Sequence, residues 1–368
     1  MEENRPKFKM KTVFYSFAVL LIFFAFGMPV SGYEWTSLPD MTYSHKAGTM
    51  TVMRNGRVLL IGGAAGDTDN THALAEIFDP VSKTFRATGS MHQKRNGHCS
   101  VALENGNVLV AGGSGGRMIP ELKSVELYNA RTGRFSVIGN MSVNRMASPA
   151  CTLLLDGNVV LTGGVYEGTM GSGNTIVDRF DSKRSTLALR VGELNAPRSG
   201  SGHAAILLNT GNILNTGGMS DYQSFASPAA ELYDPVQNRS SALSIQPTGG
   251  PGHYAAAALP DGKVILMKKG DVTYPEYYDP ACWQFETVLG AGAFKMNPAK
   301  SAIVPLRSGK ILFFTGQQLR LFDPAGNSTE LIDLPQQIRD GRCIELNNGQ
   351  LFCADLEKKS AALLTLGE

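Results

Sequence analysis

Three stretches of the sequence decide the fold: VALENGNVLVAGG at residues 101–113, TLLLDGNVVLTGG at 152–164 and AILLNTGNILNTGG at 205–218. Each stretch has two short apolar runs with a turn dipeptide between them, and each ends in two glycines. Asn-Gly and Asp-Gly between apolar runs are typical of β-hairpins with two-residue turns, in which both central residues take positive φ. Each stretch therefore predicts the two inner strands, a and b, of an antiparallel sheet.

The turn dipeptide recurs along the whole chain. Its glycine falls at Gly56, Gly106, Gly157, Gly211, Gly262, Gly309 and Gly349, at spacings of 50, 51, 54, 51, 47 and 40 residues. The Gly-Gly pair that ends strand b in the first four copies is reduced to Gly270 and Gly316 in the next two. A period near 50 residues indicates a repeat architecture in which each copy is one small sheet.

A third and a fourth strand complete each copy. The third, strand c, ends in an aromatic residue followed by Asp or Asn and often Pro, as in Phe78-Asp79-Pro80 and Tyr233-Asp234-Pro235. Asp followed by Pro is good type I turn chemistry. Strand d then carries an aromatic residue such as Phe85 or Phe135. Four antiparallel strands that cannot bury both faces alone are typical of a propeller blade.

The repeated Gly-Gly, the Glu-x-Tyr/Phe-Asp core of strand c and the aromatic of strand d resemble the kelch repeat family over residues 33–368. Residues 33–41 are in phase with strand d, and residues 341–368 supply strands a, b and c without a d. The sequence therefore predicts an all-β, seven-bladed kelch-type β-propeller closed by the N-terminal strand. The alternative is a six-bladed ring with frayed ends.

The N-terminus reads as an export signal. Basic residues between Arg5 and Lys11 precede an apolar run at 13–30, and small residues follow at 30–32. We expect residues 1–32 to be a signal peptide and 33–368 a single domain that is secreted or periplasmic. The alternative is an uncleaved membrane anchor, because 18 mostly apolar residues fall at the lower edge of a spanning helix.

Charge and cysteine content narrow the function classes. Formal net charge is +2 and residues 1–32 account for it, which leaves 30 basic against 30 acidic side chains and argues against nucleic-acid binding.

Cys343 and Cys353 lie on the arms of the last hairpin. A three-residue turn would pair them in a disulfide, whereas a two-residue turn would place Cys343 opposite Ala354. We expect the other three cysteines to be buried free thiols and no metal site.

The loops that enter strand a bring basic residues to one face of the ring, which also carries the connections between strands b and c. We expect a carboxylate-bearing ligand to bind this loop face over the axial opening, nearest to the first three of these basic residues: Arg95, Arg145, Arg198, Lys46, Arg339 and Lys295. The alternative is that each basic residue pairs with an acid at the start of strand c: Glu76, Glu126, Asp178, Glu231 or Glu276.

No catalytic motif rises above the repeat pattern. The resemblance to kelch propellers implies a binding scaffold for a protein or carbohydrate ligand, without a cofactor, and we expect a monomer. Kelch rings also occur in galactose oxidase-like enzymes and in bacterial N-acetylneuraminate epimerase. An extracytoplasmic sugar-modifying enzyme similar to that epimerase is therefore an alternative, and an envelope-anchored structural protein is another.

Overall fold

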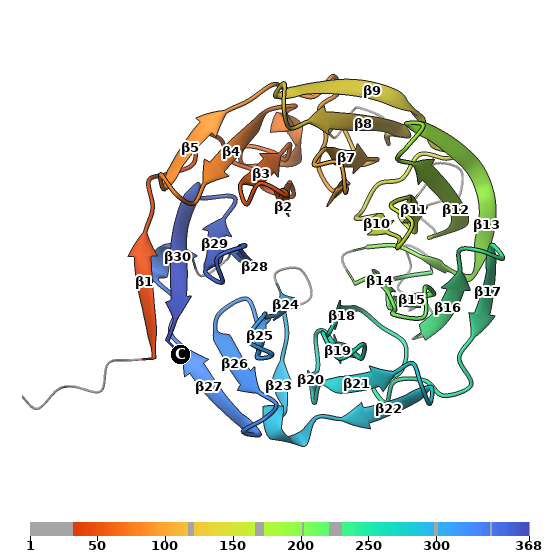
Figure 1. Ribbon diagram of the computed structural model, residues 1–368, viewed down its shortest axis with the longest axis vertical. Coiled ribbons are helices and arrows are strands. Elements are labelled where there is room, and N and C mark those ends of the chain that lie inside the picture. The colour runs from red at the N-terminus through yellow and green to blue at the C-terminus, as the bar shows by residue number, and fades with distance from the viewer. Residues whose placement is uncertain are drawn as a thin grey trace, which may run out of the picture.

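Seven four-stranded antiparallel sheets are arranged radially around a central axis (Figure 1). The computed structural model describes residues 32–116, 121–165, 173–200, 202–220, 230–297, 301–338 and 341–367, so the expected signal peptide at 1–32 lies almost wholly outside the described residues. The all-β, seven-bladed prediction is confirmed. No helix in the described ranges meets the length and apolarity that crossing a membrane requires.

Each blade runs from an inner strand a to an outer strand d. The a strands are β2 (Thr49–Val52), β6 (Cys99–Ala102), β10 (Ala150–Leu153), β14 (Ala204–Leu207), β18 (Tyr254–Ala258), β24 (Ala302–Pro305) and β28 (Arg342–Glu345). The b strands are β3 (Val58–Ile61), β7 (Val108–Ala111), β11 (Val159–Thr162), β15 (Ile213–Thr216), β19 (Val264–Lys268), β25 (Ile311–Phe314) and β29 (Leu351–Asp355).

The c strands are β4 (Ala75–Asp79), β8 (Ser124–Asn129), β12 (Asn174–Asp181), β16 (Ala230–Asp234), β21 (Glu276–Asp279), β26 (Leu319–Asp323) and β30 (Ser360–Leu366). The d strands are β5 (Thr84–Ala87), β9 (Arg134–Asn140), β13 (Thr186–Arg198), β17 (Arg239–Ala242), β22 (Gln284–Thr287), β27 (Ser328–Ile332) and β1 (Tyr33–Ser37). A small extra sheet pairs β20 (Val272–Thr273) with β23 (Phe294–Lys295), and three short 3-10 turns are η1 (Thr68–Asn70), η2 (Leu289–Ala291) and η3 (Gln336–Ile338).

The first strand in the chain is the outer strand of the last blade. β1 pairs antiparallel with β30, with Trp35 opposite Leu364, and the Trp35 indole Nε1 donates to the Asp333 carbonyl at 3.0 Å. β1 and β30 lie side by side in Figure 1. The predicted ring closure is therefore confirmed, and it leaves no open sheet edge between the ends of the chain.

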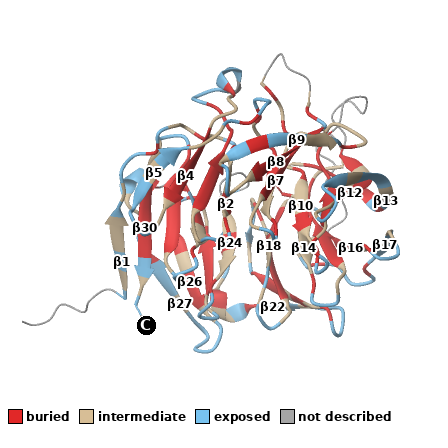
Figure 2. Cartoon of the chain, turned by 45° about the horizontal axis from the view of Figure 1, so that its top comes forward, coloured by how far each residue is buried: buried red, intermediate tan, exposed pale blue. Residues whose placement is uncertain are grey.

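The core lies between neighbouring blades. Strands b and c are buried along most of their length, whereas the d strands are mostly exposed (Figure 2). Phe78 of blade 1 stacks on Phe352 of blade 7 with ring centroids 4.5 Å apart, and Phe85 packs beside both. The aromatic residues of strands c and d therefore hold adjacent blades together.

The hairpin turns between strands a and b differ from the expected two-residue form. In the last blade Leu346 N–H donates to the Gln350 carbonyl at 2.8 Å, so three residues lie between the paired positions, and the same pattern recurs in every blade. Only the glycine takes positive φ, between 80° and 88° in all seven turns. This is the three-residue turn with a glycine bulge, in which the preceding Asn or Asp keeps an ordinary conformation.

This turn sets the cysteine register. Cys343 lies opposite Cys353 in the β28–β29 pair, and the two are joined by a disulfide. The expectation that Cys99 and Cys151 are free thiols was wrong, because these two residues are also joined, from strand a of blade 2 to strand a of blade 3. Neighbouring a strands converge at the axis, which brings cysteines 52 residues apart to a Cα separation of 5.8 Å. Cys282 is a free thiol, but it is exposed and not buried.

Candidate functional site

The three arginines expected to be nearest to a ligand are fully buried and paired with carboxylates. Each guanidinium reaches strand c of the blade that follows it in the chain: Arg95 to Glu126 at 2.6 Å, Arg145 to Asp178 at 3.0 Å and Arg198 to Glu231 at 2.9 Å. All three arginines have an exposed fraction of 0%. These contacts are those of the ion-pair alternative, and contact of these arginines with a ligand stays a prediction.

The same arginines explain the glycine pairs. Each donates from Nη1 to the carbonyl of the first glycine of a pair, with Arg95 to Gly112 at 2.7 Å and Arg145 to Gly163 at 2.8 Å. The Arg145 carbonyl accepts from Gly113 N–H at 2.7 Å, and a Cβ on Gly112 would lie 2.5 Å from that carbonyl oxygen. Glycine is therefore needed where the arginine loop of one blade crosses the end of strand b of another.

Ion pairing opposes the effect of burial in these pairs. Burial lowers the pKa of Arg145, while the Asp178 carboxylate acts in the opposite direction. Burial alone would raise the pKa of Glu126, but the amide of His92 and the charge of Arg95 lower it overall. Since each carboxylate also accepts backbone donors, the charge of each arginine is neutralised within the protein, as a buried ion requires.

In blade 1 the equivalent residue is His45 and not Lys46. The bridges Lys46–Ala64 and Asn96–Ser114 place Lys46 in register with Asn96, one residue after Arg95. His45 is fully buried, and its Nε2 lies 3.1 Å from the Glu76 carboxylate. Lys46 instead forms a half-exposed ion pair with Glu357 at 2.8 Å. Arg339, the other residue expected on this rim, lies outside the described residues.

Blade 5 departs from this pattern. Its strand c carboxylate, Glu276, accepts from the Thr248 hydroxyl at 2.7 Å. Lys269 stands where blades 1 to 4 have the second glycine of the pair, and its N–H donates to the His253 carbonyl. Burial, and secondly the nearby charge of Arg342, lowers the pKa of Lys269 to about 8. Arg342 is the first residue of β28, a strand beside the central opening (Figure 1). Solvent reaches its side chain, but the surrounding protein still lowers the pKa of Arg342 by desolvation.

In blade 6 a basic residue takes the strand c position that an acid holds in blades 1 to 5. Arg320 lies three residues before the turn residue Asp323, the position that Glu276 holds before Asp279 in blade 5. The guanidinium lies over the Phe294 ring, 4.8 Å from its centroid. A cavity of about 540 Å³ opens beside it between blades 5 and 6, and its other lining residues are Phe294, Lys295, Asn297, Thr315, Gln317 and Gln318. Lys295 was expected on this rim, whereas sequence reasoning missed Arg320.

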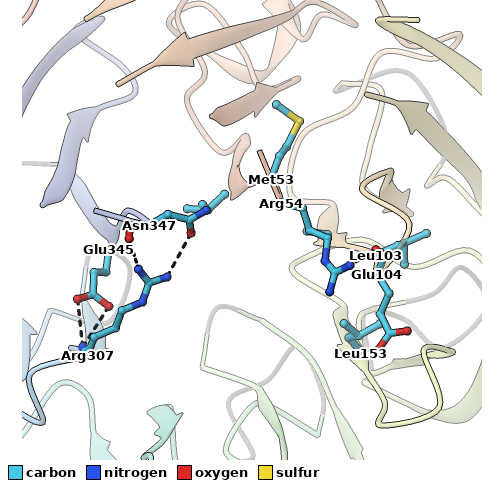
Figure 3. Close-up of a pocket in the computed structure, with 10 residues that line it drawn as sticks. Met53, Arg54, Leu103, Glu104, Leu153, Arg307, Glu345 and Asn347 are labelled. Carbon is cyan, nitrogen blue, oxygen red and sulfur yellow. Dashed lines mark hydrogen bonds between the residues drawn. The ribbon is translucent and has the colours of Figure 1, made fainter. Parts of the chain in front are cut away.

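A second cavity of about 420 Å³ lies on the opposite face, where the hairpin turns meet (Figure 3). Arg54 and Arg307 line it together with Glu104 and Glu345. Arg54 donates to the Glu104 carbonyl at 2.6 Å, and Arg307 donates from Nη2 to the Asn347 side chain at 3.2 Å and from its backbone N–H to Glu345 at 3.1 Å. Two arginines against two glutamates make this cavity charge-balanced, unlike the one between blades 5 and 6.

Comparisons with known proteins agree with the architecture. No protein-family model and no curated protein sequence matches this chain. Solved β-propellers do: YjhT has a TM-score of 0.59 and 14% identity, covering 80% of this chain and 99% of its own. Virginiamycin B lyase from Staphylococcus aureus has a TM-score of 0.61 and 13% identity, covering 91% of this chain and 99% of its own. A streptogramin B lyase has a TM-score of 0.61 and 11% identity, covering 91% and 98%. At these identities the likeness shows the fold alone.

No cluster of three or more His, Cys, Asp or Glu side chains suited to a metal ion occurs within the described ranges. The signal that could have found Arg320 is present in the sequence. When strand c of the six copies is aligned on the aromatic-Asp turn, Arg320 takes the position that an acid holds in each of the other five: Glu76, Glu126, Asp178, Glu231 and Glu276.

Proposed function

We propose that this protein is an exported binding protein of the kelch type, and that its loop face holds an acidic glycan or an acidic protein segment over blades 5 to 7. The proposal rests on which basic residues of the loop face form ion pairs within the protein and which do not. Blades 2 to 4 neutralise the buried arginines of the loop face with their own carboxylates. In blades 5 to 7, Lys295, Arg320 and Arg342 form no ion pair with any residue that the structure describes.

Like charges on a rigid ring favour an anionic ligand. The Arg342 charge is close enough to act on Lys269. Lys269 is buried, whereas solvent reaches the Arg342 side chain. An anion that enters such a site gains attraction to several cations. A face of this kind favours a ligand with several carboxylates or sulfates over a neutral one.

Export and the monomeric state are parts of the proposal. Cleavage after Gly32 would leave Tyr33, the first residue of the closing strand β1, at the mature N-terminus. N-terminal sequencing of the secreted or periplasmic protein tests the cleavage, and light scattering tests the monomer. Recovery of uncleaved protein in a membrane fraction would support the anchored structural alternative.

A sugar-modifying enzyme is the second candidate, and one feature favours it. A lysine whose pKa is about 8 can act as a general base near neutral pH. Turnover of an acidic sugar that is lost in Lys269→Met, with binding retained, would support this candidate.

The binding proposal is tested with an array of acidic and neutral glycans and acidic peptides, probed with the full chain at two salt concentrations. We expect acidic glycans to bind, with affinity falling as salt rises. Arg342→Met should weaken that binding by about tenfold, the low end for a charged hydrogen bond. The matched control is Arg54→Met on the hairpin face, which should bind like the wild type. Equal binding by both variants, or capture of neutral glycans alone, would contradict the proposal.

A further inference from the structure

The cavity between blades 5 and 6 lacks the carboxylate that the repeat puts there in the blades before it. In blades 2 to 4 an acid on strand c faces a basic residue from the loop that enters the blade. In blade 6, Arg320 stands on strand c and the entering segment supplies Lys295. Among the residues that the structure describes, those lining the cavity include two cations and no acid. We propose that the cavity binds the carboxylate of a hydroxyl-rich acid such as a uronic acid, with Arg320 as its clamp. The inference rests on the proposed function only in assuming an anionic ligand on this face.

Arg320 is held in place by an aromatic ring and not by an acid. Its guanidinium stacks on Phe294, and Phe294 is in turn fixed edge-to-face by Phe313 with ring centroids 5.1 Å apart. The Arg320 Nε is buried and has no hydrogen-bond partner among the described residues. The contact with Phe294 uses none of the guanidinium hydrogen-bond donors, and these donors have no acceptor among the described residues. A planar fork of donors matches a carboxylate in a bidentate geometry.

The rest of the lining suits a polyol. Asn297, Gln317 and Gln318 carry amide side chains, each of which can both donate to and accept from hydroxyl groups. A cavity of about 540 Å³ lies in the ordinary range for small-molecule sites. The described lining residues come from strands and turns, and none of them lies at a helix N-terminus, which commonly binds phosphate. A carboxylate therefore fits this cavity better than a phosphate does.

A short loop leaves the cavity open. In blade 6, strands b and c are joined by residues 315–318, where the Thr315 hydroxyl donates to the Gln318 carbonyl at 3.1 Å and accepts from its N–H at 3.1 Å. In blade 1 the same connection runs over residues 62–74. The tight turn thus presents Gln317 and Gln318 at the cavity without covering it.

The test is calorimetric titration of the full chain with galacturonate, galactose and galactose 1-phosphate. We expect galacturonate to bind at least about tenfold more tightly than galactose. Arg320→Gln should lose at least about tenfold in affinity, and Arg320→Glu, which restores the acid of the other blades, should abolish binding. The control Arg54→Met, on the hairpin face, should stay within about twofold of the wild type. Melting temperatures report folding, and Lys295→Gln serves as the second variant if the Arg320 variants do not fold.

Several outcomes would overturn the inference: equal binding of galactose and galacturonate, tighter binding of galactose 1-phosphate, or galacturonate affinity unchanged in Arg320→Gln. If acidic polymers bind in an Arg342-dependent manner while galacturonate does not bind, the inference fails and the proposed function stands. If galacturonate binds through Arg320 while no polymer or peptide binds, the inference stands and the broader proposal fails.

Discussion

Arg320 occupies in blade 6 the strand position that Glu276 occupies in blade 5, each three residues before the Asp of the turn that follows. This exchange of an acid for a base replaces an internal neutralising group with a second cation beside Lys295. Blade 6 still forms its four-stranded sheet, so the exchange places two cations at the cavity without disrupting the blade.

The buried arginines should prove to be structural. Arg145→Met leaves Asp178 as an unpaired buried charge, which typically costs about 3–5 kcal/mol of unfolding free energy. Arg54→Met, on the solvent-exposed hairpin face, should change stability by less than about 0.5 kcal/mol. Urea denaturation measures both. If Arg145→Met kept full stability and lost binding to an acidic ligand, the contacts of Arg145 would have to be reinterpreted as a ligand site.

Ring closure by the N-terminal strand should contribute strongly to stability. Deleting residues 33–41 removes β1 and exposes the edge of β30, and we expect a loss of several kcal/mol. Val236→Ala, at an 88% exposed turn position, is the control for a harmless change. A melting temperature unaffected by the deletion would contradict ring closure by β1.

Thiol counting should give one reactive group per chain. The chain has five cysteines, and the two disulfides leave only Cys282 free. Titration under denaturing conditions without reductant should therefore give one thiol, rising to five after reduction. Replacing Cys99 and Cys151 by Ala should cost about 2–4 kcal/mol, because the bridge closes a long loop. Finding three thiols would mean that one of the two bridges does not form, and finding five would mean that neither does.

Stability should fall on mild acidification because of His203. Burial, and secondly the charge of Arg198, lowers the pKa of His203 to about 3. The unfolded residue takes up a proton near its ordinary pKa of about 6.5, so the unfolded state binds more protons as pH falls below that value. From pH 7 to pH 5 this linkage removes about 2 kcal/mol. His203→Gln should lose less stability than the wild type over this range. An identical pH profile for His203→Gln and the wild type would exclude His203 as the source.

The blade architecture could be predicted from the sequence because it depends on local patterns repeated seven times. The hairpin glycines, the aromatic-Asp turns and the phase of residues 33–41 were enough for blade number and closure. The turn type could not be predicted, because Asn-Gly fits both a two-residue turn and a bulged three-residue turn. Only the two cysteines in the last hairpin indicated the three-residue turn.

The candidate site was harder to predict because it depends on contacts between copies. Sequence spacing was enough to place Arg95, Arg145 and Arg198 in the loops that enter strand a. Their burial could not be predicted, because it depends on how the glycine pairs of one blade contact the arginine loop of another. The Cys99–Cys151 bridge joins two repeats and so has no local pattern. Arg320 could have been found by asking where the repeat fails instead of where it recurs.

Hydrogen-exchange footprinting of the full chain with and without a bound acidic ligand, such as polygalacturonate, tests the central claim most directly. The account predicts that the ligand slows exchange at 294–297 and 315–320, the segments that line the cavity between blades 5 and 6, and leaves the hairpin face at 52–54 and 102–104 unchanged. Protection confined to the hairpin face would contradict the account.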